Sequence, residues 1–311
     1  MTIVDQPAFA PETDALLARF AAEPAGPELD PYQALLLDRE ELPDPELAGP
    51  VAPGIEVKDL TIGTLEARLY RPLTEKPRPL LLWLHGGGFI GGHLRDIECA
   101  TSGIAAVGDV TVVSLNYRLA PEDPYPAGLH DVRDALDWLR EHAAELNGDG
   151  RIAVGGQSAG AALAAGACLL ARDVGRPLPD RQILCYPSLD VDQDTESYRL
   201  FDGTFLSIAP GRWSSAQYFP AGELPATAVP LRAGSLHGLP PALILAAGRD
   251  PLRDDARDYA ARLAADDVPA RLVEYAGTMH AFLNFPGVLS AGRHAIDLIG
   301  ADLRDAFPAL R

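Results

Sequence analysis

The stretch from Arg151 to Ala171 constrains the fold more than any other part of the sequence. A short apolar run, Ile152 to Val154, leads into Gly156-Gln-Ser-Ala-Gly160, and a long apolar segment with helix-forming composition follows at once. A serine at so sharp a turn between a strand and a helix needs small neighbours, and the turn lifts its hydroxyl clear of the backbone. The N-terminus of the new helix adds free N–H groups and a positive dipole end at the same place. We therefore expect a reactive Ser158 hydroxyl at the end of a buried strand.

The chain from residue 51 onward alternates between strand-like and helix-like patterns. Residues 55–60 and 65–70 alternate apolar and polar side chains, as a half-exposed antiparallel pair does. Further strands are predicted at 79–84, 110–115, 152–154, 182–186, 242–247 and 270–275, and helices at 95–107, 131–146, 159–171, 252–265 and 290–306. Two antiparallel strands followed by strand–helix repeats predict an α/β protein with a mostly parallel central sheet and helices on both faces.

Two regions do not fit this alternation, and we assign them to a helical cap. Residues 1–50 are rich in Pro, Ala and acidic residues, with short helices predicted near 13–20 and 32–37. Residues 188–238 are rich in aromatic residues and form an irregular stretch, too long for an ordinary connection. A cap would cover the carboxyl ends of the strands, where ligands bind in such sheets. The alternative is a surface elaboration around a minor hydrophobic cluster. Residues 51–187 and 239–311 then form the main α/β domain.

The composition argues against several classes of function. A net charge of −18 disfavours a nucleic-acid partner, because binding phosphates requires clustered Lys and Arg. The three cysteines lie in scattered apolar contexts without metal-ligand spacing, so we expect no metal site and small buried side chains in a reducing compartment. No signal-peptide pattern opens the chain, and the longest apolar run is too short to span a bilayer. These observations predict a cytoplasmic protein without stable membrane insertion.

A base and an acid for Ser158 follow at suitable places along the chain. Of the seven histidines, His280 comes just after the last predicted strand, in the loop before the last helix. Asp250 follows the strand at 242–247, which gives the chain order Ser, Asp, His that an α/β hydrolase uses. Asp190, one strand earlier, is the alternative acid. We expect Asp250 to hold His280 in the required tautomer while His280 takes the proton of Ser158.

The glycine-rich loop after the strand at 79–84 supplies hydrogen-bond donors. Its sequence is His85-Gly-Gly-Gly-Phe89, and consecutive glycines let backbone N–H groups approach one oxygen closely. The tetrahedral oxyanion of acyl transfer needs such donors. The oxyanion hole is assigned to Gly86, Gly87 and Ala159, with His85, Gly88 and Gln157 in supporting positions. A phosphate cradle is the alternative, but the loop lacks both a lysine and the G-x-x-x-x-G-K-[ST] pattern.

Five motifs, taken together and in order, resemble the hormone-sensitive-lipase family of α/β hydrolases. They are His85-Gly-Gly-Gly-Phe89, Tyr117-Arg-Leu-Ala-Pro-Glu122 with Tyr125-Pro-Ala127, Gly156-Gln-Ser-Ala-Gly160, Asp250-Pro-Leu-Arg-Asp254 and His280-Ala-Phe282. The resemblance runs from about residue 55 to the C-terminus. It implies an α/β hydrolase fold, carboxylesterase activity, a cap built from the N-terminal helices and the middle insertion, and no cofactor. It also implies that Arg118 and Glu122 help to hold the oxyanion loop.

One residue beside the nucleophile departs from the family pattern. The family often has Asp or Glu before the serine, whereas this chain has Gln157. Glutamine keeps the hydrogen bonds of a carboxylate but not its charge. The subfamily and the pH behaviour of the enzyme therefore depend on what surrounds residue 157.

The function predicted from these residues is hydrolysis of a small-molecule ester through an acyl-enzyme. Short to medium acyl chains are suggested by the apolar cap and by the family resemblance. Two alternatives remain open: an amidase or formamidase with the same triad, and a ligand-binding protein that keeps the fold without turnover. The sequence does not determine the oligomeric state, and a homodimer is left open.

Overall fold

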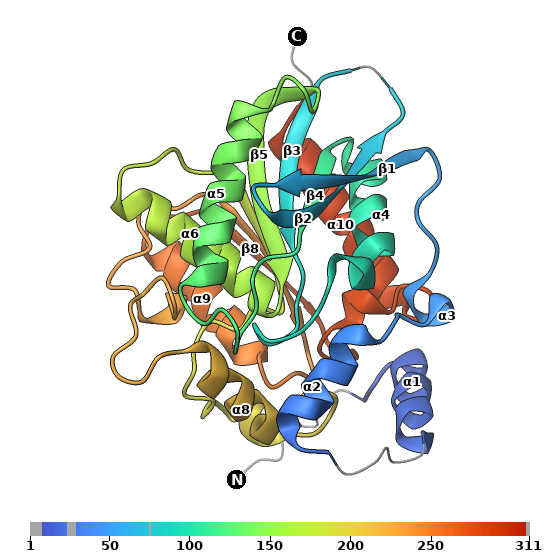
Figure 1. Ribbon diagram of the computed structural model, residues 1–311. Helices are drawn as coiled ribbons and strands as arrows, with labels where there is room; N and C mark the ends of the chain where they lie inside the picture. The colour runs from blue at the N-terminus through green and yellow to red at the C-terminus, as the bar shows by residue number, and fades with distance from the viewer. Residues whose placement is uncertain (1–7, 24–28, 75, 309–311) are drawn as a thin grey trace.

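An eight-stranded sheet organises the molecule (Figure 1). The computed structural model describes residues 8–23, 29–74 and 76–308. The strands are β1 (Ile55–Ile62), β2 (Leu65–Pro72), β3 (Arg78–Leu84), β4 (Thr111–Leu115), β5 (Gly148–Gln157), β6 (Arg181–Cys185), β7 (Ala242–Ala247) and β8 (Ala270–Tyr275), in the spatial order β1-β2-β4-β3-β5-β6-β7-β8. β2 is antiparallel to β1 and β4, and the other neighbours are parallel. The predicted mostly parallel sheet is confirmed.

The central strands are apolar because both of their faces are covered. Every residue of β3 is buried, and so is every residue of β7. In the parallel register, Leu84 at the end of β3 lies beside Gly156 near the end of β5. The glycine-rich loop and the serine turn therefore start next to each other at the same edge of the sheet.

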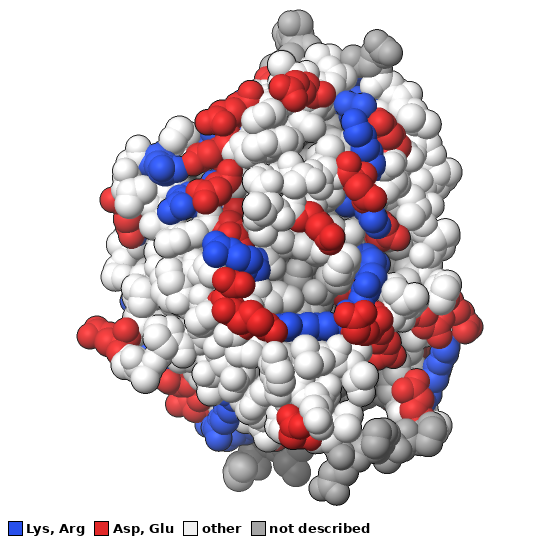
Figure 2. Space-filling view, in the orientation of Figure 1, with Lys and Arg blue, Asp and Glu red and all other residues white. Residues whose placement is uncertain are grey.

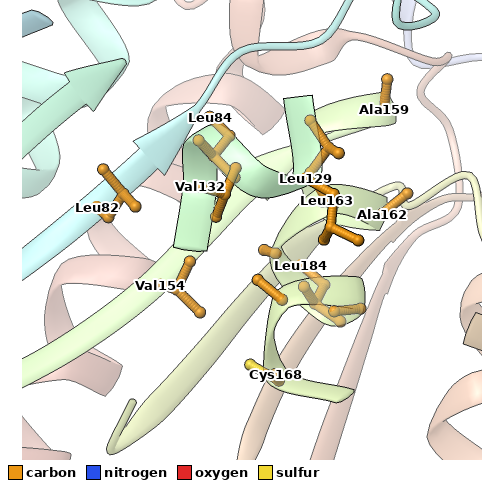
Figure 3. Close-up of a cluster of buried hydrophobic side chains, with 14 of the residues drawn as sticks. Leu82, Leu84, Leu129, Val132, Val154, Ala159, Ala162, Leu163, Cys168 and Leu184 are labelled. Atoms are coloured by element: carbon orange, nitrogen blue, oxygen red, sulfur yellow. The ribbon is translucent and has the colours of Figure 1, made fainter. Parts of the chain in front are cut away.

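Helices cover both faces of the sheet, as predicted. On one face lie α5 (Ala127–Glu141), α6 (Ala159–Asp173) and α9 (Arg253–Ala265), and on the other lie α4 (Glu98–Gly108) and α10 (Ser290–Ala306). Figure 3 shows part of the first layer, in which Leu129 and Val132 belong to the same buried cluster as Leu82 and Val154 of the strands. Leu129 and Val132 are three residues apart along α5, which is the spacing that gives a helix its apolar stripe.

Helix α5 is displaced relative to the prediction. It begins at Ala127 rather than 131 and ends at Glu141 rather than 146. Pro126 precedes it. An N–H at the start of a helix has no partner within the helix, so proline, which has no N–H, is well tolerated there. At the other end the His142 ring stacks on Trp138, with centroids 4.3 Å apart, and its Nδ1 lies 2.9 Å from the Trp138 carbonyl oxygen. These side-chain contacts, which apolar spacing does not reveal, accompany the end of the helix.

The N-terminal region and the middle insertion both contain helices. The remaining elements are α1 (Pro11–Ala22), α2 (Pro31–Glu40), α3 (Pro45–Ala48), α7 (Glu196–Phe201), α8 (Ile208–Tyr218) and the 3-10 turns η1 (Leu94–Ile97), η2 (Pro230–Arg232) and η3 (Phe282–Asn284). Figure 1 shows α1, α2 and α8 gathered at one end of the sheet. The expectation that residues 188–238 are irregular is wrong for α7 and α8. Pro210 and Gly211 stand in the first turn of α8 and only Tyr218 is buried, so its sequence shows no apolar stripe.

Acidic and basic side chains are interleaved on the face of the molecule shown in Figure 2. Over the described residues many charged side chains form ion pairs, such as Arg257 with Glu274 at 2.7 Å. This neutralises much of the basic charge locally instead of gathering it into a patch. In the part of the chain that the structure describes, no helix has both the length and the apolar character needed to cross a membrane.

All three cysteines are free thiols. Cys168 and Cys185 are buried, as expected, whereas Cys99 is only half-buried. Burial raises the pKa of Cys168 to about 12, so this thiol stays protonated at neutral pH and packs as a small apolar group.

Candidate active site

Ser158 occupies the sharp turn between β5 and α6. Its φ of 54° and ψ of −120° lie in a region that residues with a side chain rarely adopt. A Cβ on Gly160 would lie 2.3 Å from the Leu84 carbonyl oxygen, and a Cβ on Gly156 would lie 2.7 Å from the same atom. Only glycine fits on either side of the serine, and the crowded backbone holds the strained turn in place.

His280 and Asp250 lie in line behind Ser158. His280 Nε2 is 3.0 Å from Ser158 Oγ, and His280 Nδ1 is 2.7 Å from Asp250 Oδ2. Asp250 is fully buried after the end of β7, and its Oδ1 accepts the backbone N–H of Leu252 at 2.9 Å. Because the carboxylate accepts a hydrogen bond from Nδ1–H, Nε2 has no proton of its own and is left to accept one from the serine hydroxyl. The structure thus brings together the three residues that the sequence singled out.

The alternative acid Asp190 and the neighbouring Asp255 have other partners. Asp190 forms an ion pair with Arg232 at 2.5 Å and not with His280. Asp255 is buried and accepts the backbone N–H groups of Leu189 at 2.9 Å and Asp190 at 3.2 Å. Burial raises the pKa of Asp255 to about 8, although these two hydrogen bonds oppose the change. Asp255 therefore fastens the start of the insertion to α9, a role that the sequence did not indicate.

The glycine-rich loop lies directly beside Ser158. A Cβ on Gly86 would lie 3.3 Å from the Ser158 Cβ. Gly87 and Gly88 have φ values of 118° and 60°, which suit glycine and strain other residues. Among the backbone hydrogen bonds of the described residues, none uses the N–H groups of Gly86, Gly87 or Ala159. The assignment of these three N–H groups to the oxyanion hole stays a prediction.

His85 holds the start of this loop from inside the core. Its ring is buried and stacks on Tyr117 with centroids 4.4 Å apart, and the Tyr117 hydroxyl donates to the His85 carbonyl oxygen at 2.9 Å. Burial lowers the pKa of His85 to about 4, so the ring is neutral at neutral pH. Its Nδ1 donates to the Gly86 carbonyl oxygen at 2.7 Å. A neutral, stacked ring supports the loop without placing a charge near the nucleophile.

The loop is also held from α2 by Arg39, which the sequence did not single out. Arg39 Nε donates to the Ile90 carbonyl oxygen at 2.7 Å. Glu122 pairs with Arg39 at 2.9 Å and acts on the loop through it. Arg118, for which the family resemblance implied the same role, binds Asp131 of α5 at 2.6 Å instead. Arg39 and Glu122 thus connect the N-terminal helices to the oxyanion loop.

Gln157 is buried beside the triad and has hydrogen-bond partners at both ends of its amide. The Tyr186 hydroxyl donates to its Oε1 at 3.1 Å, and its Nε2 donates to Asn284 Oδ1 at 2.7 Å. The Tyr186 ring also meets the His280 ring edge-on, with centroids 4.8 Å apart. No motif in the sequence pointed to Tyr186 or Asn284, because the fold brings them to Gln157 from distant segments.

A cavity of about 800 Å³ opens above Ser158. Its lining includes Phe20 and Leu35 from the N-terminal helices and Phe205 from the insertion. The rings of Phe20 and Phe205 are in contact, with centroids 5.8 Å apart. A ligand at Ser158 would therefore lie between the sheet edge and both regions. Within the described ranges, no group of three or more His, Cys, Asp or Glu is arranged to hold a metal ion.

Sequence comparisons place this geometry in a known family. A family model described as the alpha/beta hydrolase fold, Abhydrolase_3, matches residues 81–284. Esterase LipI of Mycobacterium tuberculosis is 41% identical over 262 residues, which cover 79% of this chain and 81% of that protein. Carboxylesterase NlhH of the same species is 35% identical over 300 residues, covering 87% of this chain and 94% of that protein.

Solved structures agree with the sequence comparisons. The hyperthermophilic esterase from Pyrobaculum calidifontis has a TM-score of 0.84 and 32% identity, and the match covers 96% of this chain and 99% of that one. A thermostable esterase from Pseudomonas putida has a TM-score of 0.87 and 28% identity, covering 98% and 99%. These findings, with the contacts among Ser158, His280 and Asp250, confirm the predicted fold and enzyme class. The chain belongs to the hormone-sensitive-lipase type of the alpha/beta hydrolase family and is a serine carboxylesterase.

Proposed function

We propose that Ser158 is the nucleophile in an ester hydrolysis that proceeds through an acyl-enzyme. The observation that carries this proposal is the hydrogen-bonded line from Ser158 Oγ through His280 to Asp250. As Oγ attacks the ester carbonyl carbon, its proton passes to His280 Nε2 and the carbonyl oxygen becomes an oxyanion. The buried carboxylate of Asp250 stabilises the imidazolium that forms.

The N–H groups of Gly86, Gly87 and Ala159 then hold the oxyanion. Removing one such donor typically costs about 3–4 kcal/mol of transition-state stabilisation. Collapse of the tetrahedral intermediate breaks the bond to the alcohol oxygen, and the alcohol leaves with the proton from His280. Water attacks the acyl-enzyme while His280 accepts its proton, and collapse of the second intermediate returns that proton to Ser158 and releases the acid.

Short to medium acyl chains fit the volume and the apolar wall of the cavity. Its volume of about 800 Å³ lies within the range of small-molecule sites, roughly 300–1,000 Å³. Phe20, Phe205 and Phe285 are in mutual ring contact and form an apolar part of its wall.

We assign residues 1–50 and 188–238 to the cap, and 51–187 and 239–311 to the catalytic domain. The lining contributed by both regions supports this division.

The Ser158→Ala variant tests the nucleophile. We expect kcat for p-nitrophenyl butyrate to fall by at least about 10⁴-fold, because no other group replaces the attacking oxygen. The matched control is Ser235→Ala, whose hydroxyl lies at the surface and contacts Asp266. A fluorophosphonate probe should label wild type and Ser235→Ala at Ser158 and leave Ser158→Ala unlabelled. Near wild-type turnover by folded Ser158→Ala would contradict the assignment.

Substrate preference requires two matched series. With p-nitrophenyl esters from acetate to palmitate, we expect kcat/KM to peak at short or medium chains and to fall for chains too long for the cavity. An anilide matched to the best ester separates the esterase from an amidase on the same triad. A higher kcat/KM for the anilide would reverse the proposed ester preference while leaving the nucleophile unchanged.

A further inference from the structure

Gln157 stands at the centre of a buried series of hydrogen bonds. The Tyr186 hydroxyl donates to Gln157 Oε1, 3.1 Å away, because an amide oxygen only accepts. The amide nitrogen of Gln157 is then turned toward Asn284, and donates to Oδ1 at 2.7 Å. Each polar atom of the Gln157 side chain therefore has a partner of the right kind.

These hydrogen bonds connect the turn that carries Ser158 to the loop that carries His280. Gln157 is the residue immediately before Ser158, whereas Asn284 belongs to the segment that follows His280. Tyr186 bridges the two, because its hydroxyl bonds Gln157 and its ring packs edge-on against His280. A change at residue 157 would therefore alter the positions of both Ser158 Oγ and His280 Nε2.

The titratable groups that contact the His280 ring are its own acid and one tyrosine, and the cavity above it is also lined by Asp38 and Asp96. Asp250 is the carboxylate in contact with His280, and Tyr186 is the other titratable group that touches the ring. Two further titratable groups interact electrostatically with Asp250: Asp255 of α9 and Tyr198 of α7. Burial raises the pKa of Tyr186 well above its usual value and that of Asp255 to about 8, so both are largely neutral at pH 7.

We propose that Gln157 is a neutral positioning residue that ties the serine turn to the histidine loop and keeps an additional negative charge away from His280. This inference rests on the proposed roles of Ser158 and His280. A carboxylate at position 157 would accept from Tyr186 equally well, and Asn284 would reverse its amide to donate to it. The added negative charge would favour the imidazolium form of His280 and remove the free base at a higher pH.

The test compares Gln157→Glu with Gln157→Met, which has a similar volume but neither hydrogen bonds nor charge. The profile of kcat/KM against pH is measured with p-nitrophenyl acetate, and folding is checked by circular dichroism and urea unfolding. For Gln157→Glu we expect the acidic limb to move up by about 0.5–1 pH unit. For Gln157→Met we expect kcat to fall roughly 5- to 50-fold with the acidic limb unchanged, because positioning is lost but no charge is added.

Three outcomes would overturn the inference. One is a Gln157→Glu profile that coincides with wild type. Another is a Gln157→Met enzyme with wild-type kcat, and the third is the same shift of the limb in both variants, which would point to a general rearrangement. None of these would affect the assignment of the nucleophile, which Ser158→Ala tests separately. As a second charged variant, Asn284→Asp retains the hydrogen bond from Gln157 and should move the acidic limb in the same direction.

Discussion

The floor and the roof of the substrate cavity are held together in different ways. We define the floor as residues 84–88, 156–160, 250 and 280, and the roof as the helices α1, α2, α3, α7 and α8. In the floor, backbone segments approach so closely that a Cβ on Gly160 would lie 2.4 Å from the His85 carbonyl oxygen. In the roof, α8 buries only Tyr218, and the side chain of Leu37 on α2 is 60% exposed.

This difference separates the chemistry from the choice of substrate. A triad and its oxyanion donors must keep their geometry closely to lower the barrier, and backbone crowding provides that rigidity. The roof is held by side-chain contacts such as Phe20 with Phe205 and Arg39 with Glu122. Contacts of this kind rearrange at lower cost, so we expect the roof to adapt to a substrate while the floor stays fixed.

The strongest test of the comparison adds one methyl group to the floor. In Gly160→Ala the new Cβ would meet the carbonyl oxygens of Leu84 and His85, which belong to a buried backbone and have no room to move. We expect the free energy of unfolding to fall by about 3 kcal/mol or more, with loss of activity. Urea unfolding followed by circular dichroism measures the change.

The matched control for that variant is Gly234→Ala. No atom lies within 4 Å of a Cβ at this position, and the glycine does not have a positive φ. We expect its free energy of unfolding to remain within about 0.5 kcal/mol of wild type. Equal stability of the two variants would show that backbone crowding does not fix the floor.

A second test addresses the junction between floor and roof, where Asp255 of α9 binds the backbone at the start of the insertion. The folded-state pKa of Asp255, about 8, lies above the unfolded value of about 3.9. Its protonation therefore stabilises the fold fully below pH 4, and this contribution is lost as the pH rises toward 8. Asp255→Asn keeps an acceptor oxygen but does not titrate.

We compare the free energy of unfolding of Asp255→Asn with that of wild type at each pH. The value for the variant minus that for wild type should be at least about 1 kcal/mol larger at pH 8 than at pH 5. Urea unfolding of both proteins at several pH values measures this difference. Subtracting one protein from the other cancels the contributions of the other titrating groups. A difference that is constant with pH would show that Asp255 is ionised in the folded protein throughout this range.

The smallest effect is expected from loosening the roof itself. Arg39→Met removes the hydrogen bond to the Ile90 carbonyl oxygen and the ion pair with Glu122. We expect a loss of about 1 kcal/mol in stability, a KM raised about 3- to 10-fold and a kcat within about 2-fold of wild type. The control Arg257→Met breaks the exposed pair with Glu274 and should change none of these. A large loss of kcat in Arg39→Met would mean that the roof also positions the triad.

The triad could be predicted because each of its members follows directly after a recognisable strand. Ser158, Asp250 and His280 come after the strands β5, β7 and β8, and parallel strands deliver their carboxyl ends to one edge of the sheet. The supporting residues gave no comparable signal. Arg39 reaches Ile90 across 51 positions of sequence, and Gln157 reaches Asn284 across 127. A side chain that makes such a contact looks like any other polar residue in the sequence.

The sequence by itself determined the order of strands and helices outside the insertion, the sharp glycine-flanked turn and the identity of the three residues, Ser158, His280 and Asp250, that lie in contact. These features depend on local sterics, on apolar periodicity and on the chain order of three functional groups. Only the tertiary structure decided which residues surround them: Arg39 on the oxyanion loop, Asp255 beneath the insertion, and Tyr186 and Asn284 on either side of Gln157. Those partnerships depend on strand register and on how distant segments pack, and neither is encoded in any short stretch of sequence.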